Sequence, residues 1–319
     1  MNGMAHMHRP ETVALVEKTA AELGYRRNLL ARGMLTGKSL TVGVMLPYYV
    51  NREFNTGILE GIQSELLKHD YLAILITVDG SSLDIAHSHK LIERRVDGVI
   101  FRPHPYGESD TYLKELVNHR IPVVSVVDVE QSIDQPTDFV GVDEAMLGKR
   151  AAEHLLALGH RRIGFTRIGE ARFDVPLKVR FDAFKAAVLA AGGEILTTPL
   201  SPDPKFDQAA TEQLLTSKNR PTAVFCSVDD IAFRLMEVAR GLGLRIPEDL
   251  SVLGSCNYTA ADFTSPKLST FDLNTQEIGR QSAELLMRRI ANAGGAKATA
   301  KMYVVPELIV RESTAKLKG

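Results

Sequence analysis

Charged, polar and aromatic residues follow several short apolar segments of this chain. In an open parallel sheet, the groups that bind ligands stand directly after such strands. In chain order these candidates are Phe54, Arg102, Asp143, Arg172, Asp174, Arg180, Asp229, Cys256 and Asn257. Arginines and carboxylates bind polar small molecules through ion pairs and charge-assisted hydrogen bonds. The residues therefore predict a small-molecule binding site, for which we expect neither a metal nor a cofactor.

Catalytic chemistry is not indicated by the sequence. It contains no phosphate-cradling glycine loop, zinc-ligand spacing or nucleophile elbow. His6-x-His8 and His87-x-His89 are weak metal pairs, because alternate residues in a tail or on a helix do not converge on one ion. Cys256 has no partner histidine that the sequence can place beside it. We expect a binding protein rather than an enzyme.

The composition is that of an ordinary globular protein, with 45% hydrophobic and 24% charged residues and a net charge of -1 over 319 residues. Cys226 and Cys256 are too few for a disulfide framework, and Cys226 lies in an apolar run typical of a reduced core. No apolar run reaches the roughly 18 residues of a membrane helix, and the start lacks a secretory pattern. These features predict a cytoplasmic protein.

The elements that must position the candidate residues begin at Thr41, where short apolar runs alternate with amphipathic segments. We expect strands at 41–46, 72–77, 98–101, 123–127, 162–166, 195–198, 223–227 and 251–254. We expect helices at 57–69, 83–94, 145–158, 180–191, 209–217 and 231–242. This alternation predicts an α/β fold with doubly wound parallel sheets covered on both faces.

Two lobes account for this length. Gly159-His160-Arg161 is the predicted crossing from the first lobe to the second, and residues 268–273 the predicted return. The expected first lobe comprises residues 40–160 with about 273–292. The expected second lobe comprises residues 161–272 with about 300–313.

The first 39 residues differ from the rest, since six basic side chains stand against three acidic ones. This local charge of +3 favours an anionic partner. Pro10 suits a helix start, and apolar residues recur at helical spacing until Gly24. Asn28 can cap a second helix over residues 29–35, which is short enough to need docking for stability.

Several motifs in order resemble the lactose/galactose-repressor (LacI/GalR) family of bacterial transcription regulators. They include Asn28-x-x-Ala31-Arg32-x-Met34-x-Thr36-Gly37-Lys38-Ser39, Arg95-Val96-Asp97-Gly98-Val99-Ile100, His154-Leu155-x-x-Leu158-Gly159-His160-Arg161 and Ile246-Pro247-Glu248-Asp249-Leu250-Ser251-Val252-Leu253-Gly254. The resemblance implies a helix-turn-helix headpiece and hinge helix joined to a two-lobed, periplasmic-binding-protein-like (type I) sensor.

In this family Asn-Gly follows the DNA-recognition helix, so Asn2-Gly3 marks its end. Residues 1–27 then correspond to a headpiece remnant with its third helix, and residues 28–39 to the hinge. The first two headpiece helices are expected upstream of Met1. Either the start codon is misassigned or the gene has lost its DNA reader. We favour misassignment, because the third helix and hinge have little use alone.

The resemblance implies that the hinge helix enters the minor groove of DNA. Met34 stands where the family usually has leucine, an apolar wedge that unstacks a base step, and Arg32 and Lys38 can reach phosphates. The implied hinge and DNA residues are Asn28, Ala31, Arg32, Met34, Leu35 and Lys38. The alternative is a plain linker whose leucines pack on the sensor.

The resemblance also assigns roles around the effector. Phe54 matches a common aromatic lid, Arg102, Asp143 and Asp229 match effector contacts, and Arg172 or Arg180 matches a ligand-clamping arginine. In the alternative interpretation, Asp143 and Asp229 cap helices and Arg180 bridges the lobes.

One departure from the family concerns Gly254-Ser255-Cys256-Asn257, where the usual aromatic residue and aspartate are absent. Losing that carboxylate while keeping Arg102 and Arg172 favours an anionic effector, such as a sugar acid or phosphosugar. A Cys256→Asp variant should then bind it less well.

The leading hypothesis is a homodimeric transcriptional regulator, usually a repressor, in which effector-driven lobe closure changes operator binding. The alternative is a cytosolic small-molecule sensor without DNA-binding activity.

Overall fold

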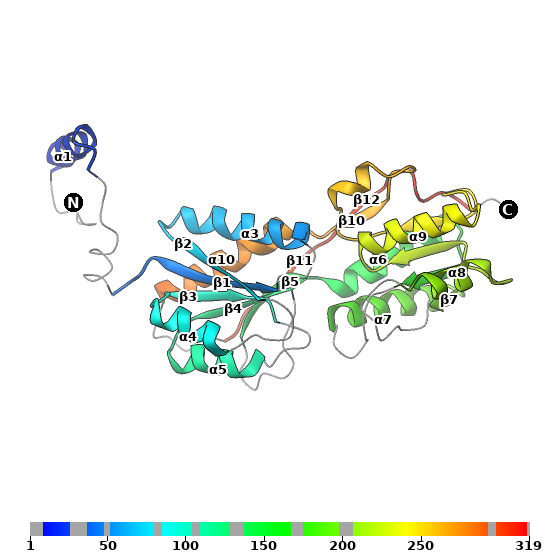
Figure 1. Cartoon of the computed structure of the whole chain (residues 1–319), viewed down its shortest axis with the longest axis horizontal. Helices are drawn as coiled ribbons and strands as arrows, with labels where there is room; N and C mark the ends of the chain where they lie inside the picture. Colours follow the sequence, from blue (N-terminus) through cyan, green and yellow to red (C-terminus); the bar gives the residue numbers. More distant parts are fainter. Residues whose placement is uncertain are drawn as a thin grey trace.

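The computed structural model describes residues 9–25, 37–47, 52–78, 85–103, 109–127, 137–166, 175–197, 207–292 and 298–317. Helix α1 (Pro10–Glu22) begins on its proline and is followed by Gly24 at φ +62°, as the sequence predicts. It lies apart from two α/β lobes placed end to end (Figure 1). The predicted helix at 29–35 falls outside the described residues. No helix within the described ranges is long and apolar enough to cross a membrane.

The first lobe contains a six-stranded, all-parallel sheet in the order β11-β5-β4-β3-β1-β2. The strands are β1 (Thr41–Pro47), β2 (Leu72–Val78), β3 (Gly98–Phe101), β4 (Val123–Val126), β5 (Asp138–Val142) and β11 (Lys301–Val304). Helices α3 (Arg52–Leu67) and α10 (Thr275–Ala291) cover one face, and α4 (Ile85–Glu93) and α5 (Ser109–Asn118) cover the other (Figure 1). Val42, Val44, Ile100 and Val124 are fully buried between these layers.

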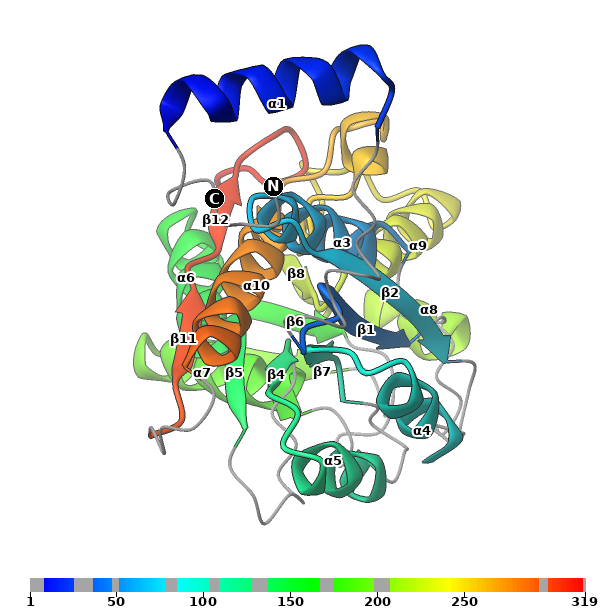
Figure 2. The same ribbon diagram turned by 90° about the vertical axis from the view of Figure 1, so that its left-hand side faces the viewer.

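Helices α3 and α10 lie side by side although more than 200 residues separate them (Figure 2). Glycines allow this close approach. A Cβ on Gly61 would stand 1.9 Å from the Gln276 carbonyl oxygen, and one on Gly279 would stand 2.0 Å from the Ile58 carbonyl oxygen. The pair therefore fixes the return of the chain to the first lobe.

The second lobe contains a four-stranded parallel sheet in the order β7-β6-β8-β9. Its strands are β6 (Arg162–Thr166), β7 (Glu194–Thr197), β8 (Ala223–Cys226) and β9 (Ser251–Leu253). Its helices are α6 (Glu144–Ala157), α7 (Val175–Ala190), α8 (Gln208–Thr216), α9 (Asp229–Gly241) and the 3-10 helix η2 (Thr259–Asp262). Phe165, Phe184 and Phe225 pack between the sheet and helices α6 and α7. Cys226 is fully buried, as predicted for a core cysteine.

The crossing from the first lobe to the second lies earlier than the sequence predicts. Helix α6 packs against α7 in the second lobe, so the chain crosses between Val142 and Glu144 rather than at Gly159-His160-Arg161. The motif at 159–161 instead joins α6 to β6 within one lobe. Gly159 has φ +91° in that turn, a conformation that glycine adopts readily.

The end of the chain also differs from the expected lobes. The sequence predicts that residues from about 300 to 313 belong to the second lobe, but β11 pairs in register with β5 of the first sheet. Only the following segment returns to the second lobe, where β12 (Glu307–Ile309) pairs antiparallel with β10 (Thr270–Asp272). Beyond it, the ring of His160 contacts Thr222, Ser251 and the Ala315 carbonyl oxygen, which attaches the final segment to the second sheet.

Candidate effector site between the lobes

The predicted site residues of the described ranges lie on elements that face the junction of the lobes. Arg102 follows β3 and Asp143 follows β5, at the carboxyl ends of first-lobe strands. Asp229 begins α9 after β8, and Cys256 and Asn257 follow β9, at the corresponding end of the second sheet. Arg172 and Asp174 lie outside the described residues. These residues therefore lie where open parallel sheets bind ligands, and their contact with an effector stays a prediction.

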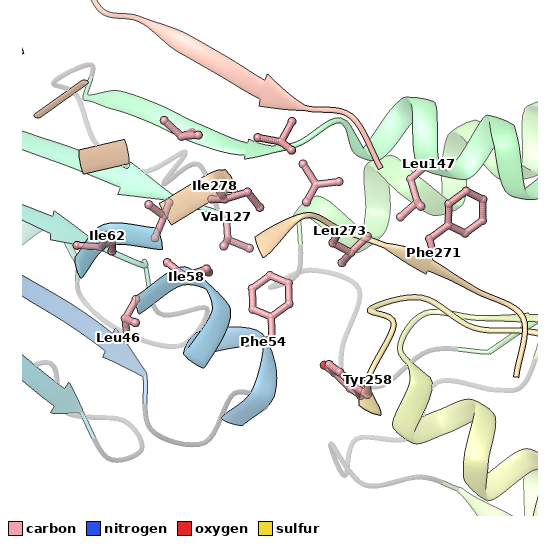
Figure 3. Close-up of a cluster of buried hydrophobic side chains, with 14 of the residues drawn as sticks. Leu46, Phe54, Ile58, Ile62, Val127, Leu147, Tyr258, Phe271, Leu273 and Ile278 are labelled. Carbon is pink, nitrogen blue, oxygen red and sulfur yellow. The ribbon is translucent and has the colours of Figure 1, made fainter. Parts of the chain in front are cut away.

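Phe54 lies in the first turn of α3 and is 7% exposed. Its ring belongs to an apolar cluster that includes Leu46 and Ile58 of the first lobe and Leu273 at the crossover, with Tyr258 nearby (Figure 3). The Arg102 guanidinium carbon lies 5.2 Å from the centre of this ring, and one Arg102 nitrogen lies 3.5 Å from the Asn55 side-chain oxygen. Phe54 and Arg102 thus form one cation–π unit on the first-lobe wall.

Asp143 caps helix α6. Its side chain accepts a hydrogen bond of 2.9 Å from the Met146 backbone N–H, and its own N–H donates to the Val304 carbonyl oxygen. The structural alternative given for this residue is therefore confirmed. The cap fixes the first crossing between the lobes beside β11.

Arg180 is held inside the second lobe by several partners at once. Its Nε and one terminal nitrogen donate to the two carboxylate oxygens of Glu144 at 2.6 and 3.0 Å. The other terminal nitrogen donates to the Ser227 carbonyl oxygen at 2.6 Å and to the Ser255 hydroxyl at 2.9 Å. Because α6 belongs to the second lobe, these four hydrogen bonds link segments of one lobe rather than the two lobes.

Asp229 is fully buried and accepts hydrogen bonds from the Thr270 hydroxyl at 2.6 Å and the Tyr258 backbone N–H at 2.8 Å. It is the first residue of α9, whose N-cap is Val228. Burial raises the pKa of Asp229 to about 6, although the two hydrogen bonds oppose that shift. Gly254 leaves room for the carboxylate, since a Cβ there would lie 2.2 Å from an Asp229 oxygen. Asp229 therefore organises the loops after β9 and before β10.

The loop after β9 is bent by two residues with positive φ, Cys256 at +129° and Asn257 at +52°. Asn257 donates to Asp272 at 3.0 Å and accepts from Arg311 at 2.8 Å, which holds the loop against the crossover. Burial raises the pKa of the Cys256 thiol to about 12. A thiol in this state is a poor nucleophile, which agrees with a binding role rather than catalysis.

Two cavities border these residues. A polar cavity of about 680 Å³ lies between α3, the start of α10 and the loop after β9, and among the predicted residues Phe54, Cys256 and Asn257 line it. A second cavity of about 260 Å³ is lined by Asp143 and Glu144 among apolar side chains. Of the predicted residues, Phe54, Cys256 and Asn257 thus line the larger cavity and Asp143 the smaller one, whereas Arg102, Arg180 and Asp229 are not among the residues that line either. The described residues contain no group of three or more potential metal ligands.

One direct contact joins the lobes beside the larger cavity. A Glu53 carboxylate oxygen, on α3, accepts hydrogen bonds of 2.6 Å from both the backbone N–H and the hydroxyl of Thr259 on η2. Neither residue was predicted. Their 206-residue separation and ordinary surface types give no signal in the sequence.

At the other end of the first lobe, the segment that enters β1 is anchored. Ser39 and Leu40 donate their backbone N–H groups to the two Asp97 carboxylate oxygens at 2.9 and 3.0 Å. Lys38, one of the implied hinge residues, is exposed immediately before this anchor. The other implied hinge residues, Asn28, Ala31, Arg32, Met34 and Leu35, lie outside the described residues.

Comparison with known proteins identifies the class. Residues 152–314 match the model of the periplasmic binding protein-like domain, and the chain belongs to that family. Its relatives make it a LacI/GalR-type regulator, so the expected family, the parallel α/β fold and the absence of an enzymatic role are confirmed.

Two curated relatives illustrate the match. The HTH-type transcriptional repressor PurR of Vibrio vulnificus is 28% identical over 307 residues, covering 95% of this chain and 89% of the relative. Catabolite control protein A of Priestia megaterium is 27% identical, covering 88% of this chain and 84% of the relative.

Two solved structures show the same architecture. The cellobiose complex of the transcriptional regulator CelR superposes with a TM-score of 0.74 at 26% identity, covering 98% of this chain and 93% of that one. A LacI-family regulator from Enterococcus faecium with bound ribose gives a TM-score of 0.70 at 27% identity, covering 87% and 100%.

Proposed function

We propose that this protein is a ligand-responsive transcriptional regulator whose two lobes bind a small sugar-type effector between them and control operator DNA. The observation that supports the proposal is the placement of candidate residues after strands of both sheets, with Arg102 and Asp143 after β3 and β5, and Asp229 and Cys256 after β8 and β9. Relatives of the same architecture include a cellobiose complex and a ribose complex, which supports a sugar-type ligand. Closure of the lobes couples the effector to the DNA-binding end.

The finer prediction of a sugar acid or phosphosugar depends on arginines. Arg180 is already paired with Glu144, so an acidic group of the effector depends on Arg102 and on Arg172. Among the described residues, only Arg102 of the first lobe is left to support the acid, which stays a proposal.

We also propose that the protein acts as a homodimer. Leu72 and Leu75 are 50% and 47% exposed on β2, the edge strand of the first sheet, and Phe263 is 82% exposed on the second lobe. An exposed edge strand with apolar side chains favours association with a second chain. Sedimentation velocity on wild type and on Leu75→Lys should show a dimer and a shift toward monomer.

The functional test is selection of genomic DNA fragments by the protein purified from its native host, followed by a ligand panel of neutral sugars, sugar acids and sugar phosphates. Sequence-selective DNA binding that one ligand changes supports the proposal. Ligand binding without sequence-selective DNA binding would favour the alternative, a sensor without a DNA-reading role.

A further inference from the structure

Glu144 and Arg180 form a buried ion pair in the second-lobe wall of the proposed site, with 11% and 4% of their side chains exposed. The pairing is bidentate, at 2.6 and 3.0 Å. This is the geometry in which arginine grips a free carboxylate or phosphate. Here the anion comes from the first turn of α6 rather than from a ligand.

Two further hydrogen bonds hold the Arg180 guanidinium in place. A terminal nitrogen donates to the Ser227 carbonyl oxygen and to the Ser255 hydroxyl, and that hydroxyl donates to the same carbonyl oxygen at 2.6 Å. A ligand anion could bind Arg180 in bidentate fashion only by displacing Glu144. Displacement would leave a carboxylate in a largely buried position without its partner, which is strongly unfavourable.

The surroundings of the pair also disfavour an anion. Glu144 lines the 260 Å³ cavity next to Asp143, among the apolar side chains of Val142, Pro176 and Tyr303. An entering anion would approach two carboxylates with little polar surface to receive it. An uncharged hydroxyl group can instead donate to either carboxylate.

We propose that Glu144 is a specificity-determining residue. Because its carboxylate already pairs with Arg180, the second-lobe wall selects an uncharged, hydroxyl-bearing part of the effector. This inference rests on the proposed function. It also explains how the site tolerates cysteine at position 256, since Glu144 supplies a carboxylate near the place where the family usually has one. Arg180 joins the two positions, since it donates to Glu144 and also to the hydroxyl of Ser255, the residue before Cys256.

The first test requires neither effector nor DNA, so it remains interpretable if the protein proves not to regulate transcription. Thermal unfolding of wild type and Glu144→Ala is compared in sodium acetate and sodium chloride of equal ionic strength. Acetate should stabilise Glu144→Ala saturably, with an apparent Kd about tenfold or more below that of wild type. The double variant Glu144→Ala/Arg180→Met should lose this response.

The matched control is Glu153→Ala on the same helix, where Glu153 is 57% exposed and pairs with Lys149 at 3.8 Å. It should respond to acetate as wild type does. An equal acetate response in folded Glu144→Ala and wild type overturns the proposal. If Glu144→Ala does not fold, Glu144→Gln keeps the side-chain volume and should show a smaller acetate response in the same direction. If neither folds, a refolding yield that rises equally in acetate and chloride overturns it.

The second test addresses specificity with two defined probes, D-glucose and D-gluconate. Gluconate should raise the melting temperature of Glu144→Ala more than that of wild type. Glucose should not raise the melting temperature of the variant more than that of wild type. An equal gluconate shift in both proteins would overturn the specificity role even if acetate stabilises the variant.

Discussion

The second lobe faces the junction with a buried polar network, whereas the first lobe faces it with a phenylalanine and an arginine at the end of an apolar sheet. In the second lobe, Arg180 and Asp229 each bind groups from distant segments. In the first lobe, Arg102 stacks on Phe54. The contrast indicates that the second-lobe wall is preorganised and that its groups have a structural role before any ligand arrives.

The largest expected effect comes from the arginine of the second lobe. Arg180→Met should lower the free energy of unfolding by about 3–5 kcal/mol, because it leaves the Glu144 carboxylate without its partner. Arg102→Met, the matched change in the first lobe, should cost about 1 kcal/mol, the scale of a cation–π contact. Urea denaturation measures both. Equal losses would remove the contrast between the lobes.

Asp229 gives the next largest effect, and it depends on pH. Its folded-state pKa of about 6 lies above the ordinary aspartate value, so the folded protein holds this proton more tightly than the unfolded chain. The associated stability is present below about pH 4 and is lost as the pH rises through about 6. The free energy of unfolding of wild type, minus that of Asp229→Asn, should therefore fall by up to about 3 kcal/mol between pH 4 and 7. Urea denaturation at each pH measures this difference. A flat difference would contradict the buried, partly protonated state.

His160 should produce a smaller change of the opposite sign. Burial lowers the pKa of this histidine, so the unfolded chain binds its proton more readily than the folded protein. Stability is then lost as the pH falls below about 6.5, where the unfolded histidine is protonated. His160→Asn should weaken this acid sensitivity, so its melting temperature should fall less than that of wild type between pH 7.5 and 5.5. The surface variant His119→Asn, on the first lobe, is the control and should leave it unchanged.

The smallest energetic effect is expected at the contact between the lobes. Glu53→Ala removes the acceptor of both Thr259 hydrogen bonds and should cost about 1 kcal/mol or less, since the pair is exposed. Glu53→Gln keeps a carbonyl oxygen for the same donors. The lobe separation, measured by fluorescence energy transfer between labels on the two lobes, should increase in Glu53→Ala and not in Glu53→Gln. An unchanged separation in both would show that this contact does not hold the lobes.

The sequence predicts the parallel sheets well, because most of their strands are continuous apolar runs. The segment Gly98–Phe101 is an example whose predicted bounds match the structure. Strand β5 is not predicted, since its run of Asp138-Phe139-Val140-Gly141-Val142 begins with a charge and contains a glycine. Asp138 is buried there because Arg289, 151 residues away, pairs with it at 2.6 Å. Helices α5 and α10 and the short strands β10, β11 and β12 are likewise absent from the predicted elements.

The candidate site shows the same limit. The sequence alone places Asp143 and Asp229 near strand ends and Arg180 at the start of a helix, yet the partners of these residues decide their roles. Glu144 and Ser255, which bind Arg180, come from segments 36 and 75 residues away. No local pattern connects them. The family resemblance pointed to Arg180 as a candidate, but only the three-dimensional structure shows that Glu144 pairs with it.

Within the described residues, the chain passes between the lobes at three places: after β5, between β10 and α10, and between β11 and β12. Neither lobe is consequently a continuous stretch of sequence. A gene fusion with a single junction cannot exchange a whole lobe between two relatives, because α10 and β11 would remain with the wrong parent. Recombination in such a protein should therefore keep the first-lobe and second-lobe walls of the site together. New effector preferences should arise instead by substitution at positions such as 144.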